Sequence, residues 1–226
     1  MKLPFPIMSW NLLISMPLFL VSALIHASDQ QDDLWGDIAP VVSGVNDETL
    51  VFLMEPPGKL VHHHQHWITA NRTSLDDGWV TVSQCHHRLD PVALSQITFR
   101  KGRVRELEVL SSERIGSVRV EEDSIQLEDV EKGASLCLKG ELRLVTKLDN
   151  GGYLLRSGPF MRRFLDGYYP LRVSYQLDYR DLELKLVAYT PSDQAGFQTN
   201  RMPGQFGFDA WFEGRLDLNL IFKGNQ

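Results

Sequence analysis

The chain has 226 residues, which is long enough for one domain with a substantial hydrophobic core. Hydrophobic residues make up 43% of it and charged residues 23%, which are proportions of ordinary globular proteins and argue against a wholly disordered chain. The formal net charge is −6 and Lys and Arg do not cluster, so we expect no nucleic-acid partner and no polybasic contact with a membrane.

Residues 1–27 have the composition of a secretory signal peptide. Lys2 gives a minimal positive start, an apolar run extends over residues 12–25, and Ala27 provides a small residue before a polar stretch. The run is shorter than the roughly 20 apolar residues that span a bilayer. We therefore predict cleavage after Ala27 and a periplasmic or secreted mature chain that is not an integral membrane protein. Retention of the segment as an uncleaved anchor is the alternative.

The remainder divides into an N-terminal arm, residues 28–46, and a single β-rich domain, residues 47–226. The arm is polar with scattered apolar residues, whereas in the domain apolar residues recur with the period of two that is typical of half-buried strands. The predicted strands cover residues 50–54, 60–69, 79–85, 96–100, 104–110, 117–120, 124–127, 136–146, 153–156, 171–179, 182–189, 206–212 and 215–222. Many short strands at this spacing predict a mostly β fold, an antiparallel sandwich or a flattened barrel.

Turn residues separate several of these strands, and one segment favours a helix. Residues 76–78 (Asp-Asp-Gly) and 149–152 (Asp-Asn-Gly-Gly) are typical of turns. Pro159 suits the first turn of a helix and Gly167 suits its end, so one short helix is expected over residues 160–165. Residues 190–205 are rich in Pro, Gly, Ser and Asn and predict a long loop.

The chain has two cysteines, Cys85 and Cys137. An oxidising compartment outside the cytoplasm favours a disulfide between them. The bridge would close a loop of about 50 residues, which the chain-entropy model values at roughly 4 kcal/mol. Two buried free thiols, or Cys85 as a metal ligand, are the alternatives.

Six of the seven histidines form two groups, at residues 62–66 and 86–87. In a strand over residues 60–69, His62, His64 and His66 share one face, because side chains alternate along a strand. Residues 79–87 are the natural antiparallel partner; one register places His86 beside the three histidines, and the other places its sequence neighbours there. Imidazoles on neighbouring strands suit Zn or Cu, so the candidate metal ligands are His62, His64, His66 and His86. Histidines that are solvated or packed without a metal, and a surface that responds to pH, are the alternatives.

A second candidate site lies in residues 158–170, where aromatic residues, two arginines and a carboxylate surround the expected helix. Arg and Tyr are common in binding hot spots. A groove for an anion or a carbohydrate could be built from four candidate ligand-binding residues, Arg162, Arg163, Tyr168 and Tyr169. The alternative is a helical plug that closes one end of the β core, with Asp166 paired to an arginine and with Phe160, Met161, Phe164 and Leu165 facing inward.

The sequence contains no complete catalytic motif: no Gly-x-Ser-x-Gly elbow, no Gly-rich phosphate loop and no dinucleotide fingerprint. We therefore expect a non-catalytic periplasmic binding or accessory protein whose partner is an envelope protein or a small ligand. The alternatives are a metal-binding protein that holds Zn or Cu with the histidines, and a hydrolase that uses a metal-bound water and an adjacent carboxylate.

Several segments of the chain are distinctive: the N-terminal signal, the three histidines at residues 62–64, Gly-Trp-Val at residues 78–80, Gln-Cys-His at residues 84–86, and the whole of residues 158–170. Together they resemble a group of exported proteobacterial proteins that has no assigned activity. The resemblance covers most of the mature chain. It implies a bacterial periplasm and assigns no functional residue.

Overall fold

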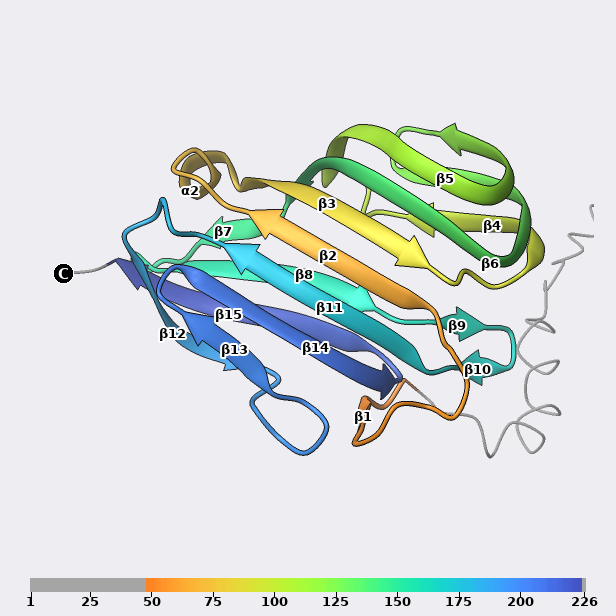
Figure 1. Cartoon of the computed structure of the whole chain (residues 1–226). Coiled ribbons are helices and arrows are strands. Elements are labelled where there is room, and N and C mark those ends of the chain that lie inside the picture. Colours follow the sequence, from red (N-terminus) through yellow and green to blue (C-terminus); the bar gives the residue numbers. More distant parts are fainter. Residues whose placement is uncertain (1–47, 225–226) are drawn as a thin grey trace, which may run out of the picture. The chain divides into compact units, whose positions relative to one another are not determined.

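The computed structural model describes residues 48–224, which belong to one compact unit. The predicted signal peptide, residues 1–27, and the predicted arm, residues 28–46, lie outside the described residues. Between residues 48 and 224 the chain is mostly β-structure with one short helix (Figure 1). No helix in this range is long and apolar enough to cross a membrane.

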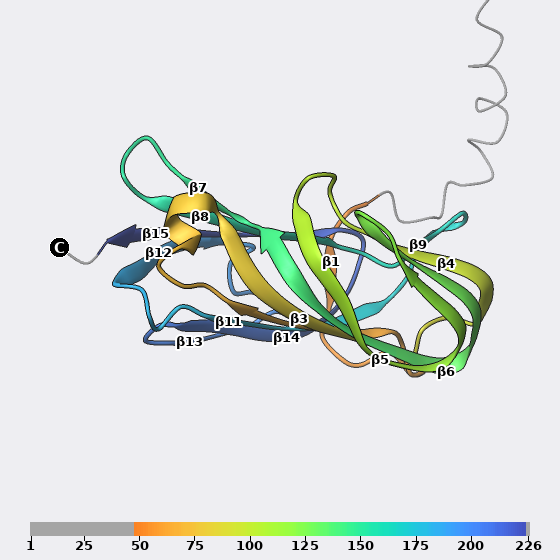
Figure 2. The ribbon, with the colours of Figure 1, turned by 90° about the horizontal axis from the view of Figure 1, so that it is seen from above.

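Two sheets form the layers of the molecule (Figure 2). The larger sheet has nine strands: β1 (Val51–Leu53), β2 (His63–Thr69), β3 (Trp79–His87), β4 (Val92–Thr98), β5 (Val104–Val120), β6 (Ser124–Arg143), β11 (Leu171–Asp178), β13 (Thr199–Met202) and β14 (Gln205–Glu213). The smaller sheet has four: β7 (Val145–Lys147), β8 (Tyr153–Phe160), β12 (Leu184–Thr190) and β15 (Leu216–Gly224). A separate hairpin consists of β9 (Arg163–Phe164) and β10 (Gly167–Tyr168).

The strand order identifies the fold as a sandwich. The larger sheet runs β1-β14-β11-β2-β3-β6-β4, with β13 beside β14 and β5 beside β6, and the smaller sheet runs β12-β15-β8-β7. Within the described range the pairs of strands are antiparallel except for β2 with β11, and neither sheet closes into a barrel. The prediction of a mostly β, antiparallel sandwich is therefore confirmed.

The alternation of side chains along each strand divides the larger sheet into an inner and an outer face. β2 pairs with β3 so that His64 lies opposite His86, and with β11 so that His64 lies opposite Val173. Of the two registers considered for β2 and β3, this is the one that places His86 beside the candidate histidines. Val173 is fully buried, so residues of this parity face the smaller sheet and the residues between them face outward.

The main hydrophobic core lies between the two sheets. The larger sheet contributes Tyr175, Phe208 and Phe212, and the smaller sheet contributes Leu218 and Leu220. The rings of Tyr175 and Phe208 stack with their centroids 5.4 Å apart. Because burying one large apolar side chain stabilises a fold by about 1.5–3 kcal/mol, this interface accounts for the association of the two layers.

A second hydrophobic core lies inside the curled hairpin of β5 and β6, together with β4; we call these three strands the β4–β6 lobe. Its buried members are Ile125, Leu127, Val130, Ala134, Leu136 and Leu138. β5 is one strand of 17 residues rather than two short ones, and three register shifts interrupt its pairing with β6. Glu106 and Arg114 adopt positive φ angles of 56° and 57° at two of these shifts. Since bulges bend and twist a strand, they allow the hairpin to curl around its own apolar side chains.

The helix in the described range is α2 (Ser74–Asp77), at a different place from the predicted one. The side-chain oxygen of Asn71 accepts a hydrogen bond from the N–H of Ser74 (3.2 Å) at the beginning of the helix. Gly78 ends it in the left-handed region, with φ 83°, and donates its N–H to the carbonyl oxygen of Ser74 (3.1 Å). The predicted turn at residues 76–78 is thus the end of a helix.

Residues 160–165, where the helix was expected, form extended structure, so that prediction is wrong. β8 continues to Phe160, and β9 and β10 follow as a hairpin in which Phe164 pairs with Gly167. The N–H of Tyr169 donates to the carbonyl oxygen of Arg162 (2.9 Å) at the base of the hairpin. Pairing between strands therefore overrides the local helix signals of this segment.

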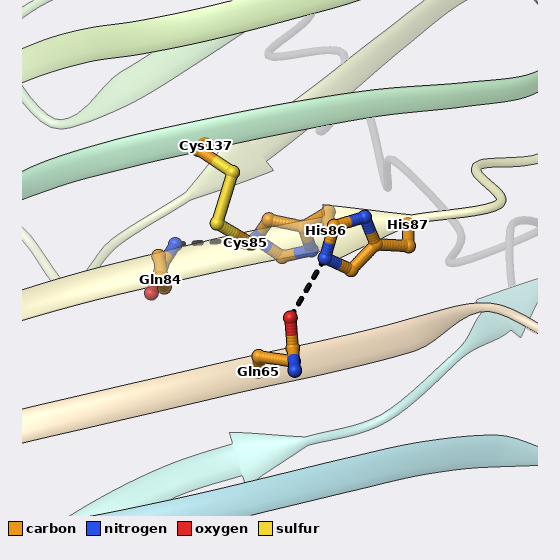
Figure 3. The surroundings of a disulfide bond; sticks show 6 residues. All are labelled: Gln65, Gln84, Cys85, His86, His87 and Cys137. Atoms are coloured by element: carbon orange, nitrogen blue, oxygen red, sulfur yellow. Dashed lines mark hydrogen bonds between the residues drawn. A yellow bond between two sulfur atoms is a disulfide. The ribbon is translucent and has the colours of Figure 1, made fainter.

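The predicted disulfide between Cys85 and Cys137 is present (Figure 3). The two cysteines are direct cross-strand partners on β3 and β6, with Cα atoms 4.1 Å apart. The 52 positions that separate them in sequence include β4, β5 and the first half of β6. The bridge therefore fastens the β4–β6 lobe to the rest of the larger sheet.

Candidate functional site

Four histidines gather on the inner face of the larger sheet, and we call them the histidine cluster (His62, His64, His66 and His86). The rings of His64 and His86 stack with their centroids 4.2 Å apart. The centroid of His66 lies 5.2 Å from that of His64, and the centroid of His62 lies 5.3 Å from that of His86. His62 Nε2 is 3.1 Å from His86 Nδ1. The structure thus brings together all four residues that the sequence nominated as metal ligands.

The histidine cluster forms a polar seam where the two hydrophobic cores meet. On one side, the ring of His66 lies 5.7 Å from that of Tyr175, which belongs to the main core. On the other side, His86 is the cross-strand partner of Leu136, which belongs to the second core. Gln84 is buried beside them, and its Nε2 lies 3.2 Å from His86 Nε2 (Figure 3).

The protein itself satisfies the hydrogen-bonding capacity of this seam only in part. His86 has His62 on one ring nitrogen and Gln84 on the other. His64 Nε2 and both ring nitrogens of His66 are buried without a hydrogen-bond partner. A buried polar group left in this state costs about 1–3 kcal/mol. The seam is therefore a place where the fold carries an energetic cost.

Burial lowers the pKa of every member of the histidine cluster, because a charged ring is poorly solvated there. The pKa of His62 falls from 6.5 to about 4, and that of His66 to about 3. The pKa values of His64 and His86 also fall well below 6.5, through burial first and then through repulsion between neighbouring rings. All four imidazoles are consequently neutral at pH 7, the form that can coordinate a metal.

The rings are nevertheless not arranged as a metal centre. Across residues 48–224, no group of three or more His, Cys, Asp or Glu side chains is positioned to hold one ion. His64 and His86 stack face to face instead of directing their nitrogens at a shared point. Asp90, the carboxylate that acts on His62, forms two hydrogen bonds with Arg162, at 2.5 and 2.8 Å. Metal binding by the histidine cluster stays a prediction.

The same two strands also place histidines on the outer face, where each ring has a side-chain partner. His63 lies directly opposite His87. His63 Nε2 is 2.7 Å from Ser174 Oγ, and His87 Nε2 is 2.8 Å from Gln65 Oε1 (Figure 3). Burial, helped by the nearby Arg172 guanidinium, lowers the pKa of His63 to about 4.

The four predicted ligand-binding residues lie on or beside the β9–β10 hairpin, where each is tied to a carboxylate. Arg162 pairs with Asp90 (2.5 Å), Arg163 lies 3.9 Å from Glu48, the Tyr168 hydroxyl donates to Glu48 (2.8 Å), and the Tyr169 hydroxyl donates to Asp166. The expectation that Asp166 pairs with an arginine is therefore wrong, since its hydrogen bond comes from a tyrosine. These contacts fix the hairpin at the end of the larger sheet (Figure 1).

The apolar side chains of this hairpin point mostly to solvent. Leu165, at the tip, is fully exposed, and Met161 and Phe164 are 43% and 39% exposed. Phe160, on the preceding strand, is the buried member of the four residues expected to form a plug. The predicted plug is thus wrong at the other three positions, because the segment projects from the sheet rather than closing its core.

A cleft of about 910 Å³ that the sequence analysis missed lies between β12 and β13. Its apolar lining consists of Leu182, Leu184, Leu186 and Tyr189, and its polar or basic lining includes Arg180, Lys185, Asn200 and Arg201. β12 is the edge strand of the smaller sheet, and β13 pairs on one side with β14 of the larger sheet. β13 lies in residues 190–205, which composition alone marks as a loop. The feature of the sequence that could have indicated this cleft is the alternation of Leu182, Leu184 and Leu186, which marks one apolar side of a strand.

Comparison with known proteins assigns no family to the chain. No family model matches it, and no curated protein matches it. Among solved structures, it is similar to a two-domain M1 zinc metallopeptidase bound to L-tryptophan, at 11% sequence identity and a TM-score of 0.35. The similarity covers 79% of this chain and 44% of that chain, so the chain spans less than half the length of that protein. A likeness this low carries no argument about fold or function.

Proposed function

We propose that this chain is an exported, non-catalytic binding protein that holds its ligand in the cleft between β12 and β13. The observation that carries the proposal is the cleft itself, with a volume of about 910 Å³. Small-molecule sites typically have volumes of about 300–1,000 Å³ and combine an apolar lining with a few polar groups. The volume of the cleft lies in this range, and its lining combines apolar side chains with polar ones that make up the larger part of its surface.

The lining of the cleft favours a ligand with an apolar body and one negative charge. Leu184 and Leu186 are half-buried and offer apolar contact. Two of the cations are already in ion pairs, Arg180 with Asp178 and Arg201 with Asp193. Lys185 is exposed and makes no ion pair with any residue between 48 and 224. Because side chains alternate along a strand, Lys185 lies on the opposite side of β12 from the two leucines. A ligand would therefore place its apolar chain against the leucines and reach Lys185 with an anionic head group over the open edge of β12.

Binding of a fluorescent amphiphile tests the cleft. Dansyl-undecanoate is titrated into the purified mature chain, and we expect saturable binding. Lys185→Glu, at an exposed position that leaves the core intact, should weaken binding about tenfold, which corresponds to about 1.4 kcal/mol. Lys147→Glu on β7 makes the same charge change away from the cleft and should leave the affinity unchanged. Absence of saturable binding, or equal losses in the two variants, would refute the assignment.

Export has a test of its own. The support for it is the N-terminal sequence and the disulfide, which forms and persists mainly in oxidising compartments. We expect the full chain, produced in a bacterium with a C-terminal epitope, to fractionate with the periplasm, to begin at Ser28 and to carry no free thiol. A cytoplasmic chain with reduced cysteines would overturn export without bearing on the cleft.

A second candidate function, metal binding, is favoured by one specific contact. His62 Nε2 and His86 Nδ1 are 3.1 Å apart, and unpartnered nitrogens of His64 and His66 lie in the same seam. A structural zinc site takes four ligands, so the ring of His64 would have to turn out of its stack on His86. A hydrolase would need a free carboxylate as well, and Asp90 is engaged by Arg162.

Titration with Zn(II) and Cu(II) distinguishes this candidate from the first. The protein is purified without a histidine tag and dialysed against a chelator before the titration. Stoichiometric binding that is lost in a His62→Ala/His64→Ala variant would support the metal site. Binding no tighter than in that variant rejects it.

A further inference from the structure

Three tryptophans lie on the outer face of the larger sheet, and the ring of one of them is uncovered. The guanidinium of Arg105 lies 4.3 Å from the ring centroid of Trp79, and that of Arg172 lies 4.7 Å from the ring centroid of Trp211. Trp67 is on β2, between the strands that carry the other two, and is 37% exposed. No aromatic or cationic side chain of residues 48–224 stacks on it, so its indole face is open to a ligand.

The residues that surround Trp67 on this face are uncharged and polar, or have no side chain that rises above the sheet. Its direct cross-strand neighbours are Ser83 on β3 and Gln176 on β11. The next position beyond Gln176 is Gly207 on β14, which has no side chain to rise above the sheet. Gln65 precedes Trp67 on the same face of β2. A flat ligand can therefore reach the indole ring and meet amide and hydroxyl groups beside it.

Most of the charged side chains around Trp67 on this face are compensated. Four ion pairs hold them: Arg172 with Asp209 (2.7 Å), Arg105 with Glu141 (2.5 Å), Lys139 with Glu108 (3.0 Å) and Arg180 with Asp178 (2.5 Å). Arg143, opposite Trp79, donates to the carbonyl oxygen of Asp77 instead. His63 is neutral at pH 7, since burial lowers its pKa to about 4. A surface that offers hydrogen bonds but little net charge is complementary to a neutral, hydroxyl-rich ligand rather than to an ionic one.

From these features we infer that the outer face around Trp67 binds a neutral carbohydrate chain. A pyranose ring presents a face of C–H groups that stacks on an indole ring, and its hydroxyls exchange hydrogen bonds with amide and hydroxyl side chains. Ser83 and Gln176 supply these groups on the two strands that flank Trp67. Gln65 can add the N–H groups of its amide, since its Oε1 is bonded to His87. The outer face of the larger sheet is not covered by the smaller sheet, which lies on its other side (Figure 2), so an extended sugar chain can lie along it. This site does not involve the cleft between β12 and β13.

Calorimetric titration with three hexasaccharides, chitohexaose, cellohexaose and maltohexaose, tests the inference. We expect at least one of them to bind and to change the tryptophan fluorescence. Trp67→Ala should weaken this binding about tenfold, because a stacked aromatic contact adds up to about 1.5 kcal/mol. Trp67→Phe keeps an aromatic face and should retain most of the affinity.

The matched control is Trp79→Ala, which removes a tryptophan of the same face whose ring Arg105 already covers. It should leave the affinity for the hexasaccharide unchanged. Gln176→Ala is a second test at an exposed position that leaves the core intact, and it should weaken binding about fivefold through the loss of one hydrogen bond. Failure of all three sugars to bind, unchanged affinity in Trp67→Ala and Gln176→Ala, or equal losses in the Trp67→Ala and Trp79→Ala variants would overturn the inference. Dansyl-undecanoate binding, measured in the same samples, reports on the cleft separately.

Discussion

On the inner face of the larger sheet, His64 and His66 are enclosed between two apolar cores and have ring nitrogens without a hydrogen-bond partner. On the outer face, His63 and His87 each contact a polar side chain of an adjacent strand. Neighbouring residues of one strand are separated in this way because side chains alternate between the two faces. A run of histidines in one strand is therefore not one site, because each face of the sheet gives the same residue type a different energetic role.

The largest expected effect of this difference is a loss of stability in mild acid. In the unfolded chain the rings bind protons near pH 6.5, whereas the pKa of folded His62 is lowered to about 4 and that of folded His66 to about 3. The unfolded state therefore binds more protons, and stability falls as the pH falls below 6.5. Below pH 6.5 each ring costs about 1.4 kcal/mol per pH unit, so these two rings alone lower the stability by about 4 kcal/mol between pH 7.5 and pH 5. The melting temperature should drop by about 10 °C over this range.

Thermal unfolding from pH 7.5 to pH 5, in a buffer with a chelator, measures this effect. A His66→Leu variant removes one of the titrating rings from the inner face. Its melting temperature should therefore depend less steeply on pH than that of the unmodified chain. A melting temperature that stays constant down to pH 5 would show that the inner rings are already accessible to protons in the folded state.

Removal of the disulfide should have the next largest effect, up to about 4 kcal/mol for a loop of this length. A Cys85→Ser/Cys137→Ser variant releases the β4–β6 lobe, whose inner side packs against the histidine cluster. We expect chemical denaturation to show lower stability, and hydrogen exchange to show the loss of protection concentrated in β4, β5 and β6. A uniform loss over both sheets would mean that the bridge does not act on the lobe in particular.

The sequence predicted much of this sheet, because period-two alternation reports directly on strands. It predicted that β2 pairs with β3 in antiparallel fashion. It allowed two registers, one of which places His86 beside the candidate histidines. It could not choose between them, since that choice depends on which face meets the smaller sheet. The disulfide was predicted from the presence of two cysteines in a chain expected to be exported, and the structure shows it as a cross-strand pair.

The errors arose where distant contacts override local preference. Residues 160–165 have helix boundary signals, yet β9 pairs with β10 there, and Arg162 before the hairpin is bound to the distant Asp90. The second core was not foreseen because the bulges at Glu106 and Arg114 occur in residues without turn chemistry. The cleft and the open face of Trp67 depend on which strands end up at an edge and which rings an arginine covers. Neither is encoded in any short segment.

Substitution of His66 by leucine should stabilise the protein at pH 7 by about 1 kcal/mol. The reason is that the change removes two buried nitrogens that have no partner and keeps an apolar side chain of similar size. His63→Leu is the matched change on the outer face, and it should destabilise by about 1 kcal/mol because it breaks the contact with Ser174. Urea denaturation compares the two variants. Destabilisation of both by the same amount would mean that the inner ring is as well satisfied as the outer one.

The hydroxyl that partners His63 on the outer face can be removed without changing the histidine. Ser174→Ala removes this hydroxyl, which lies 2.7 Å from His63 Nε2 and also hydrogen-bonds the Asp209 carboxylate, and should lower the free energy of unfolding by about 1 kcal/mol. Ser83→Ala lies on the same face, but its side chain makes no hydrogen bond with any residue between 48 and 224, so its effect should stay within about 0.5 kcal/mol. If urea denaturation gives the same value for both, the partner of His63 contributes nothing to stability. The histidines of the two faces would then differ in burial alone. A hydrogen-bond partner would make no difference to what a histidine of this sheet contributes to stability.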